Sequence, residues 1–349
     1  MKVLVPYDGA ELSEQAAVMA IELLAQHHVD LELLHVAPDE AHAAKTRASL
    51  EAAVARLGRS PVAVTPVSRI GRPAQEIVQY ADQHGVDLIA MSTHGRSDFM
   101  RMLVGSVTDR VIRTSPVPVL VLHPPAMSLD RISPPTGRKL RVLVPLDGSA
   151  LANEAASMAV SLLDPKSIEV SLVCVVGTPE RESLTAREIL HAAAARLDER
   201  GVPTWMRILQ GEAANQIVEC AAQGGHDLIV MSTHGHSMLT RALVGSTTDR
   251  VVRMSDVPVL VIQPSSMETP FDPVSGEDVN LDEAAYTSEY HGRTFSFTSF
   301  EHKQQFDGDP EAYVSRRLAR RDFFPAPEDG MAVGPSGAVA VIPQATRDA

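Results

Sequence analysis

Short apolar runs alternate along most of this chain with segments whose apolar residues recur at helical spacing. The runs are typical of strands buried on both faces, and the segments between them have the period of amphipathic helices. The strands expected in the first 125 residues are 2–8, 31–36, 64–70, 87–92 and 117–123. The expected helices are 13–26, 47–57, 73–85 and 106–115. Such alternation predicts an α/β fold with a parallel, doubly wound sheet.

The whole pattern occurs twice. Residues 87–122 match residues 227–262 without a gap, and about two thirds of the positions are identical. Residues 1–17 likewise match residues 140–156, so a whole domain has been duplicated. We therefore expect one domain at 1–125, a proline-containing linker at 126–139, a second domain at 140–264 and a tail at 265–349.

Composition limits the classes of function. The chain has 349 residues and a formal net charge of −13, which argues against a general affinity for nucleic acid. No apolar stretch approaches the ~20 residues that a membrane helix needs, and Asp8 interrupts the first apolar run, so neither a membrane span nor a signal peptide is expected. Cys174 and Cys220 have no paired spacing, which favours the reducing cytoplasm over an oxidising compartment.

The tail differs from the rest of the chain. It carries 7 Lys and Arg against 15 Asp and Glu, and ten of the fourteen aromatic residues. We expect it to be acidic and partly disordered, with strand-like alternation at 293–300 and a short helix within 309–324, capped by Asp309. Its aromatic residues either belong to a flexible segment or dock on the domains or on another protein.

Three features of each copy converge at the carboxyl ends of strands, where open α/β sheets hold their ligands. The first is an aspartate after the first strand. The second is a Ser-Thr-His-Gly segment after the fourth strand, and the third is a Gly-Ser pair ten residues later that opens a helix. In the two copies these features are Asp8, Ser92–Gly95 and Gly105-Ser106, and Asp147, Ser232–Gly235 and Gly245-Ser246.

The Gly-Ser pair predicts an anion site. A helix N-terminus offers unpaired backbone N–H groups and a partial positive charge. Glycine lets these amides approach a phosphate, and the serine hydroxyl adds a donor. Arg101 and Arg241 either cover the phosphates or are solvated, and a carboxylate such as Asp8 suits a ribose hydroxyl or a phosphate-bound Mg²⁺.

These residues and their duplication resemble the universal stress protein family, as a tandem two-domain member. The resemblance covers approximately residues 1–264, and the tail lies outside it. The family signature is Gly-x2-Gly-x9-Gly-Ser/Thr on a five-stranded parallel sheet of flavodoxin-like or Rossmann-like type, and its ATP-binding members hold phosphates with this loop. Ser92 and Ser232 depart from the signature, because they stand where its first glycine is expected.

The resemblance implies a set of nucleotide-binding residues in each copy, on the adenosine side, along the chain after the fourth strand and around the phosphates. In the first copy these are Pro6, Tyr7, Asp8, Val36, Met91, Ser92, His94, Gly95, Gly105, Ser106, Val107 and Thr108. In the second they are Pro145, Leu146, Asp147, Val175, Met231, Ser232, His234, Gly235, Gly245, Ser246, Thr247 and Thr248.

The resemblance also implies pairing of domains through their fifth strands. An exposed apolar edge is a liability unless it is paired. Two copies on one chain are then expected to form an intramolecular pseudo-dimer, and further homodimerisation is left open.

Each feature also has a purely structural interpretation. Asp8 and Asp147 are alternatively helix N-caps, and Gly105 and Gly245 alternatively serve a tight turn. His94, His234 and His236 suggest a metal site, but no carboxylate or cysteine lies at ligand spacing, so no metal site is predicted.

Three functional hypotheses follow. The favoured one is a cytoplasmic stress-response regulator that binds ATP or a similar adenine nucleotide and whose occupancy modulates binding of an unidentified protein partner. The second is slow Mg²⁺-dependent ATP hydrolysis, although no general base and no Walker lysine loop are evident. The third is a nucleotide-free scaffold, which the serines at 92 and 232 keep open.

Overall fold

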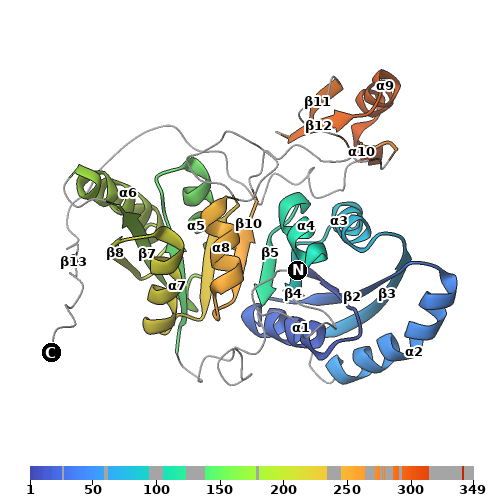
Figure 1. Ribbon diagram of the computed structural model, residues 1–349, viewed down its shortest axis with the longest axis horizontal. Helices are drawn as coiled ribbons and strands as arrows, with labels where there is room; N and C mark the ends of the chain where they lie inside the picture. Colours follow the sequence, from blue (N-terminus) through green and yellow to red (C-terminus); the bar gives the residue numbers. More distant parts are fainter. Residues whose placement is uncertain are drawn as a thin grey trace. The chain divides into compact units, whose positions relative to one another are not determined.

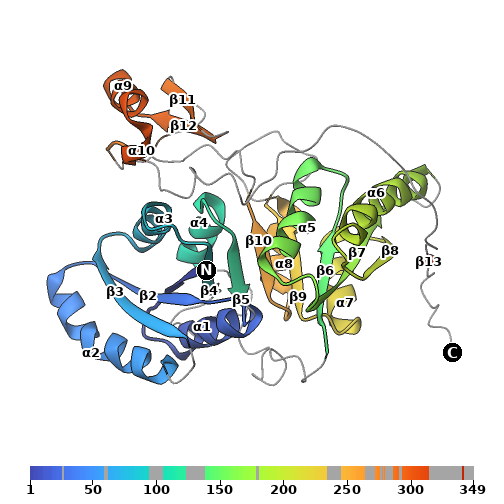
Figure 2. The same cartoon turned by 180° about the vertical axis from the view of Figure 1, so that it is seen from behind.

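The fold was analysed in a computed structural model of the chain, shown from two sides in Figures 1 and 2. The structure describes residues 1–25, 27–58, 62–93, 105–122, 138–177, 181–233, 245–263, 272–275, 277, 279, 286–290, 293–313 and 340–341. It contains two compact units. One holds the first copy and the 272–313 region, the other holds most of the second copy, and each is described by itself.

The first copy is a five-stranded parallel sheet with the strand order β3-β2-β1-β4-β5. Its strands are β1 (Lys2–Pro6), β2 (Asp30–Ala37), β3 (Ala63–Ile70), β4 (Leu88–Ser92) and β5 (Val119–Leu122). Its helices are α1 (Glu11–Leu23), α2 (Glu40–Leu57), α3 (Pro73–Gln83) and α4 (Ser106–Thr114). Helix α1 packs beside α2, and α3 packs beside α4, so both faces of the sheet are covered. This doubly wound, flavodoxin-like or Rossmann-like fold confirms the fold class predicted from the sequence.

The second copy repeats this architecture with the strand order β8-β7-β6-β9-β10. Its strands are β6 (Leu140–Pro145), β7 (Ile168–Val176), β8 (Thr204–Gln210), β9 (Leu228–Ser232) and β10 (Val259–Ile262). Its helices are α5 (Ala150–Leu162), α6 (Arg181–Asp198), α7 (Ala213–Gln223) and α8 (Ser246–Met254). A short strand β13 (Ala340–Val341) pairs with the outer edge of β8.

The order of the strands determines where a ligand can bind. In the first copy β1 pairs with β2 on one side and with β4 on the other, through Val3↔Leu31 and Val3↔Leu88. The connections that leave β1 and β4 therefore diverge to opposite faces of the sheet, which opens a crevice outside the carboxyl ends of these two strands. The middle residues of both strands are buried, with Leu4 and Ile89 inaccessible to solvent, whereas the residues at their carboxyl ends, Pro6 and Ser92, are half-buried.

One helix begins earlier than the sequence pattern indicated. The apolar spacing predicted a helix over 47–57, whereas α2 starts at Glu40 and is capped by Asp39, whose side chain accepts a hydrogen bond from the His42 amide. Only Leu50, Ala53 and Leu57 of α2 are buried. The first two turns lack an apolar face, and apolar periodicity therefore could not reveal them.

The described part of the tail is folded. Strands β11 (Tyr286–Tyr290) and β12 (Arg293–Phe297) form an antiparallel hairpin, followed by α9 (Phe300–Gly308) and α10 (Pro310–Tyr313). The aromatic rings of Phe295, Phe297 and Phe306 form its core, with Val274 and Tyr313 packed against them. We call residues 272–313, as far as they are described, the C-terminal module. Its buried aromatics pack on one another, an arrangement that neither sequence interpretation considered.

Several sequence expectations lie outside the described residues. These are the linker from 126 to 137 and the tail beyond Tyr313, except for β13. Within the residues that are described, no helix combines the length and the apolar character that crossing a membrane requires.

The aromatic core should hold the C-terminal module together. We expect Phe306→Ala to destabilise it by about 3–5 kcal/mol, because the buried ring contacts Phe295, Phe297 and Tyr313. Hydrogen exchange of the β12 amides would measure the loss. Phe300→Ala is the matched control, since that ring is 54% exposed. Equal effects of the two changes would contradict the assignment of Phe306 to the core.

Candidate functional site

The aspartate after the first strand of each copy lies in a tight turn. Asp8 is exposed, and its Oδ1 accepts hydrogen bonds from the Ala10 amide at 3.0 Å and from the Ser13 hydroxyl at 3.3 Å. Asp147 Oδ1 accepts a hydrogen bond from the Ser149 amide at 2.9 Å. The N-cap residues of α1 and α5 are instead Ala10 and Ser149, so neither aspartate is a helix cap. Each carboxylate stabilises its turn and remains exposed at the crevice.

A left-handed glycine follows each aspartate. Gly9 has a φ of 85° and Gly148 a φ of 88°, values that other residues rarely adopt. The Asp-Gly pair therefore turns the chain sharply between strand and helix. Any side chain at Gly9 or Gly148 would strain this turn and displace the carboxylate before it.

The residues beside these aspartates are mostly part of the protein interior. Tyr7 is buried, its amide donates to the Leu34 carbonyl at 2.7 Å, and its hydroxyl lies 3.1 Å from the Ser49 hydroxyl. Leu146, the counterpart of Tyr7, is buried too. Both side chains therefore belong to the interior of their domains.

The remaining residues of the expected adenosine side are partly accessible. Pro6 and Val36 in the first copy are half-buried, as are Pro145 and Val175 in the second. They lie at the carboxyl ends of β1, β2, β6 and β7, so all four are placed at the edge of the sheet where the crevice opens.

The first turn of α4 is fixed to the end of β4 by two hydrogen bonds. The Gly105 amide donates to the Thr93 carbonyl at 2.7 Å, and the Thr108 hydroxyl donates to the Ser92 carbonyl at 3.0 Å. Met91 and Thr93 are buried, and Ser92 is half-buried. These bonds hold the start of the helix at a fixed height above the sheet.

The second copy has the same pair of bonds. The Gly245 amide donates to the Thr233 carbonyl at 2.6 Å, and the Thr248 hydroxyl donates to the Ser232 carbonyl at 2.9 Å. Like Thr108, Thr248 is buried. Both threonines, which the family resemblance suggested as phosphate ligands, thus use their hydroxyls to position the helix.

The glycine of each Gly-Ser pair permits a close approach of backbone to backbone. Gly105 has a φ of −57° and a ψ of 144°, which any residue can adopt. A Cβ atom there would lie 3.0 Å from the Thr93 carbonyl oxygen, a distance tighter than nearly all real Cβ contacts. Gly245 has nearly the same dihedral angles. Left-handed geometry is therefore not the reason for glycine at these positions.

The N-termini of α4 and α8 have the properties of an anion site. Gly105 and Gly245 are the N-cap residues, and among the described residues no side chain caps either helix. The first intrahelical bond of α4 is from the Asp109 amide to the Gly105 carbonyl, so the three preceding amides have no partner within the helix. Ser106 and Ser246 are exposed at these ends.

A negative side chain in the first turn of each helix is neutralised. Asp109 would oppose a bound anion, but Arg113 forms a bidentate ion pair with it at 2.9 and 3.0 Å. Arg253 holds Asp249 in the same way, at 2.8 Å for both bonds. The partial positive charge of the helix end is therefore not cancelled by its own sequence.

The rest of each candidate site lies outside the described residues. His94, Gly95, Arg101, His234, Gly235, His236 and Arg241 belong to this group. Among the residues that are described, no three His, Cys, Asp or Glu side chains are arranged to hold a metal ion. Cys174 and Cys220 are buried and form no disulfide.

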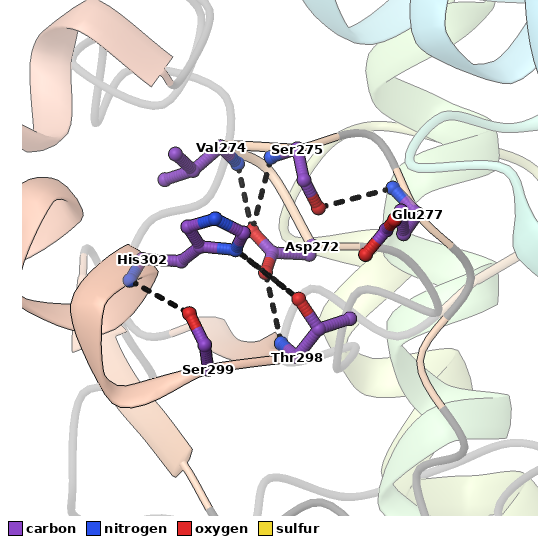
Figure 3. A network of polar contacts seen from close by, with 7 residues as sticks. All are labelled: Asp272, Val274, Ser275, Glu277, Thr298, Ser299 and His302. Atoms are coloured by element: carbon purple, nitrogen blue, oxygen red, sulfur yellow. Dashed lines mark hydrogen bonds and ion pairs between the residues drawn. The ribbon is translucent and has the colours of Figure 1, made fainter.

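A second polar cluster occurs in the C-terminal module (Figure 3). Asp272 is fully buried, and its Oδ2 accepts hydrogen bonds from the Thr298 amide and hydroxyl, both at 2.8 Å, and from His302 Nδ1 at 2.6 Å. Its Oδ1 accepts from the amides of Val274 at 2.9 Å and Ser275 at 3.3 Å. One carboxylate thus ties the first described residues of the module to the start of α9.

The hydrogen bonds decide the charge of this carboxylate. Burial alone would raise the pKa of Asp272, but the bonds donated by Thr298, Val274 and His302 outweigh burial and hold that pKa below its ordinary value. Sequence analysis missed this cluster, because Asp272 and His302 are 30 residues apart and neither lies in a recognisable motif.

Comparisons with known proteins agree with this geometry. Residues 1–123 and 140–263 each match the model of the universal stress protein family. The chain belongs to the universal stress protein family. It carries two copies of the family's domain in tandem, as the sequence predicted.

Individual proteins and solved structures resemble parts of the chain. Universal stress protein MJ0531 of Methanocaldococcus jannaschii is 32% identical over 143 residues, which are 37% of this chain and 84% of that protein. A crystal structure of a universal stress protein from Archaeoglobus fulgidus shares the fold, with a TM-score of 0.61 and 22% identity over 75% of this chain and 98% of its own. A universal stress protein solved in complex with cAMP matches 36% of this chain and 98% of its own, with 23% identity and a TM-score of 0.32.

The C-terminal module has a separate resemblance. Residues 271–317 match the model of the YHS domain. The universal stress protein copies are therefore followed by a segment that is similar to another family, and the sequence analysis treated it only as an acidic, aromatic-rich tail.

The buried carboxylate of Asp272 should make the stability of the C-terminal module depend on pH. Because the pKa of Asp272 is lowered in the folded state, its stabilising contribution is present above the ordinary value of 3.8 and is lost as pH falls below it. At neutral pH, Asp272→Asn should destabilise the C-terminal module by about 1–3 kcal/mol, because buried donors lose their charged acceptor. It should also remove this acid dependence. Hydrogen exchange of the module between pH 7 and 3 would measure both effects, and an unchanged pH profile in the variant would refute the role of Asp272.

Proposed function

We propose that each universal stress protein copy binds an adenine nucleotide, with ATP as the expected ligand, and that occupancy controls a surface recognised by a protein partner. The observation that carries this proposal is the uncapped start of α4 and of α8 beside an exposed carboxylate. The strands β1 and β4 are neighbours, so Asp8 and Ser106 follow strand ends at the same edge of the sheet. A phosphate at the helix start and a ribose or a phosphate-bound Mg²⁺ at the aspartate would use both groups.

The two sites are not equivalent. Tyr7 in the first copy corresponds to Leu146 in the second. The His35 ring donates from Nδ1 to the Tyr7 carbonyl at 2.9 Å, whereas the corresponding strand position in β7 is Cys174. Both differences lie next to the conserved turn geometry around the aspartates, so we expect the two copies to bind nucleotide with different affinities.

Binding and helix stability should respond in opposite directions to one substitution. Ser106→Asp places a carboxylate at the first position of α4, which should stabilise the helix by about 0.3–1 kcal/mol through its dipole. The same carboxylate should repel phosphate and weaken ATP binding in the first copy by about tenfold or more. Ser246→Asp should do the same in the second copy, and equilibrium dialysis with labelled ATP would measure each.

The neutral replacement Ser106→Asn is the matched control, because it keeps a polar side chain of similar size without the charge. Thermal melting with and without ATP provides a second measurement, since a ligand at 100 times its Kd stabilises the native state by about 2.7 kcal/mol. Repeating it with EDTA separates the two roles of Asp8, because only the Mg²⁺ role requires the metal. If the native chain shows neither uptake nor a thermal shift at millimolar ATP, the scaffold hypothesis replaces this proposal.

We also propose that the fifth strands β5 and β10 pair within the chain, which would make a pseudo-dimer. Each lies at the edge of its own five-stranded order and reads Val-Leu-Val-Leu or Val-Leu-Val-Ile. Such apolar edges promote aggregation unless they are covered. The cytoplasm is the proposed compartment, since neither cysteine is used in a disulfide.

Pairing of the fifth strands would couple the stability of the two copies. Leu260→Ala removes a buried side chain from β10 and should cost about 2–5 kcal/mol. If the strands pair, hydrogen exchange of the β5 amides should accelerate in this variant as well. Unchanged exchange in β5 would contradict the pseudo-dimer.

A further inference from the structure

The outer edge of the second copy is occupied by a distant part of the same chain. Strand β8 ends the order of its sheet, and β13 pairs with it in parallel through Ala340↔Arg207 and Val341↔Ile208. Both strands belong to the same compact unit, and Figure 1 shows β13 beside β8. The pairing joins residues that are more than 130 positions apart in the sequence.

The sequence around β13 suits such a position. The tail is acidic, but residues 330–346 contain no Asp, Glu, Lys or Arg. Within them, residues 338–342 read Ala-Val-Ala-Val-Ile and lie between Pro335 and Pro343. Proline ends a pairing strand because it has no N–H group. The prolines therefore restrict strand pairing to this short apolar stretch. Residues 211–339, which connect β8 to β13, exceed the length that a parallel connection requires.

The corresponding edge of the first copy is protected differently. Strand β3 occupies the same place in its sheet, and it contains Pro66. A proline on an edge strand removes one donor and discourages the addition of another strand. Strand β8, with the sequence Thr-Trp-Met-Arg-Ile-Leu-Gln, has no proline. Of these two outer edge strands, β8 therefore lacks the proline that β3 contains.

The β8 edge also carries an exposed aromatic side chain. Trp205 is 51% exposed and lies two residues before Arg207, the partner of Ala340. Exposed apolar side chains next to open backbone donors and acceptors are the features that strand-addition sites use. The backbone supplies affinity there, and the alternate side chains supply selectivity.

We propose that the β8 edge is a strand-addition site and that the chain's own β13 is its resident occupant. Release of β13 opens the edge to an extended, uncharged apolar segment of a partner protein. The C-terminal stretch thereby acts as an intramolecular competitor for that partner. This surface is separate from the nucleotide crevice, so the proposal does not depend on ATP binding.

The full chain provides its own probe, because Trp205 is its single tryptophan. Deleting residues 336–349 should make the outward-facing β8 amides exchange about tenfold faster and should increase quenching of Trp205 fluorescence by acrylamide. Deleting only residues 345–349 removes the same terminus but keeps β13, and should change neither. A synthetic peptide of residues 334–345 should restore slow exchange in the longer deletion.

A backbone variant tests the pairing itself. Successive N–H groups of a strand point to opposite sides, so Ala340→Pro together with Val341→Pro removes whichever donor faces β8. This variant should behave like the longer deletion, whereas Ala340→Ser with Val341→Thr keeps both N–H groups and should behave like the native chain. Unchanged β8 exchange in the longer deletion, or in the double-proline variant, would overturn the proposal. Protection of β8 that falls on dilution would also overturn it, because the occupant would then come from a second copy.

Discussion

In each copy, the attachment of one helix start to one strand end positions the backbone amides of the candidate anion site. In the first copy the Gly105 amide and the Thr108 hydroxyl bind consecutive carbonyls at the end of β4, and the second copy repeats both bonds at β9. Two bonds from one turn to one strand end restrict how the helix can tilt or slide against the strand. The first-turn amides are thus held in a defined position relative to the strand end. A site built this way does not have to be assembled when the ligand arrives.

Duplication has preserved this attachment and changed what surrounds it. The ion pairs Asp109–Arg113 and Asp249–Arg253 have nearly the same geometry, whereas Tyr7 has become Leu146 in the second copy. The edges have diverged as well, with Pro66 in β3 and the paired strand β13 beside β8. What the copies share is the geometry of the helix start, and what they do not share lies beside the aspartate turns and at the outer edges. The two copies thus share the helix start and differ in the residues around it.

Much of the architecture could be predicted from the sequence, because short apolar runs and helical spacing both report burial. The repeat then identified the aspartates after the first strands and the Gly-Ser pairs without any structure. The function of Thr108 could not be foreseen, since a threonine after Gly-Ser suits a phosphate as well as a strand carbonyl, and only the register of α4 against β4 decides. The early start of α2 escaped notice because its first turns are exposed and have no apolar face.

The packing of the C-terminal module could not be predicted from the sequence, for a different reason. Alternation at 293–300 indicated a strand, but it could not show that the hairpin of β11 and β12 packs Phe295 and Phe297 against Phe306 in α9. Its stabilising carboxylate, Asp272, is joined to residues 26 and 30 positions later, a distance at which sequence periodicity carries no information.

That carboxylate has a mechanical consequence. Asp272 lies at the start of the segment that matches the YHS domain, and later residues of the module donate hydrogen bonds to it, namely Thr298 and His302. A force that pulls on the chain before Asp272 would therefore load these hydrogen bonds before it loads the aromatic core. Several bonds converging on one charged group would rupture together rather than one after another, so the module should resist small forces and then yield abruptly.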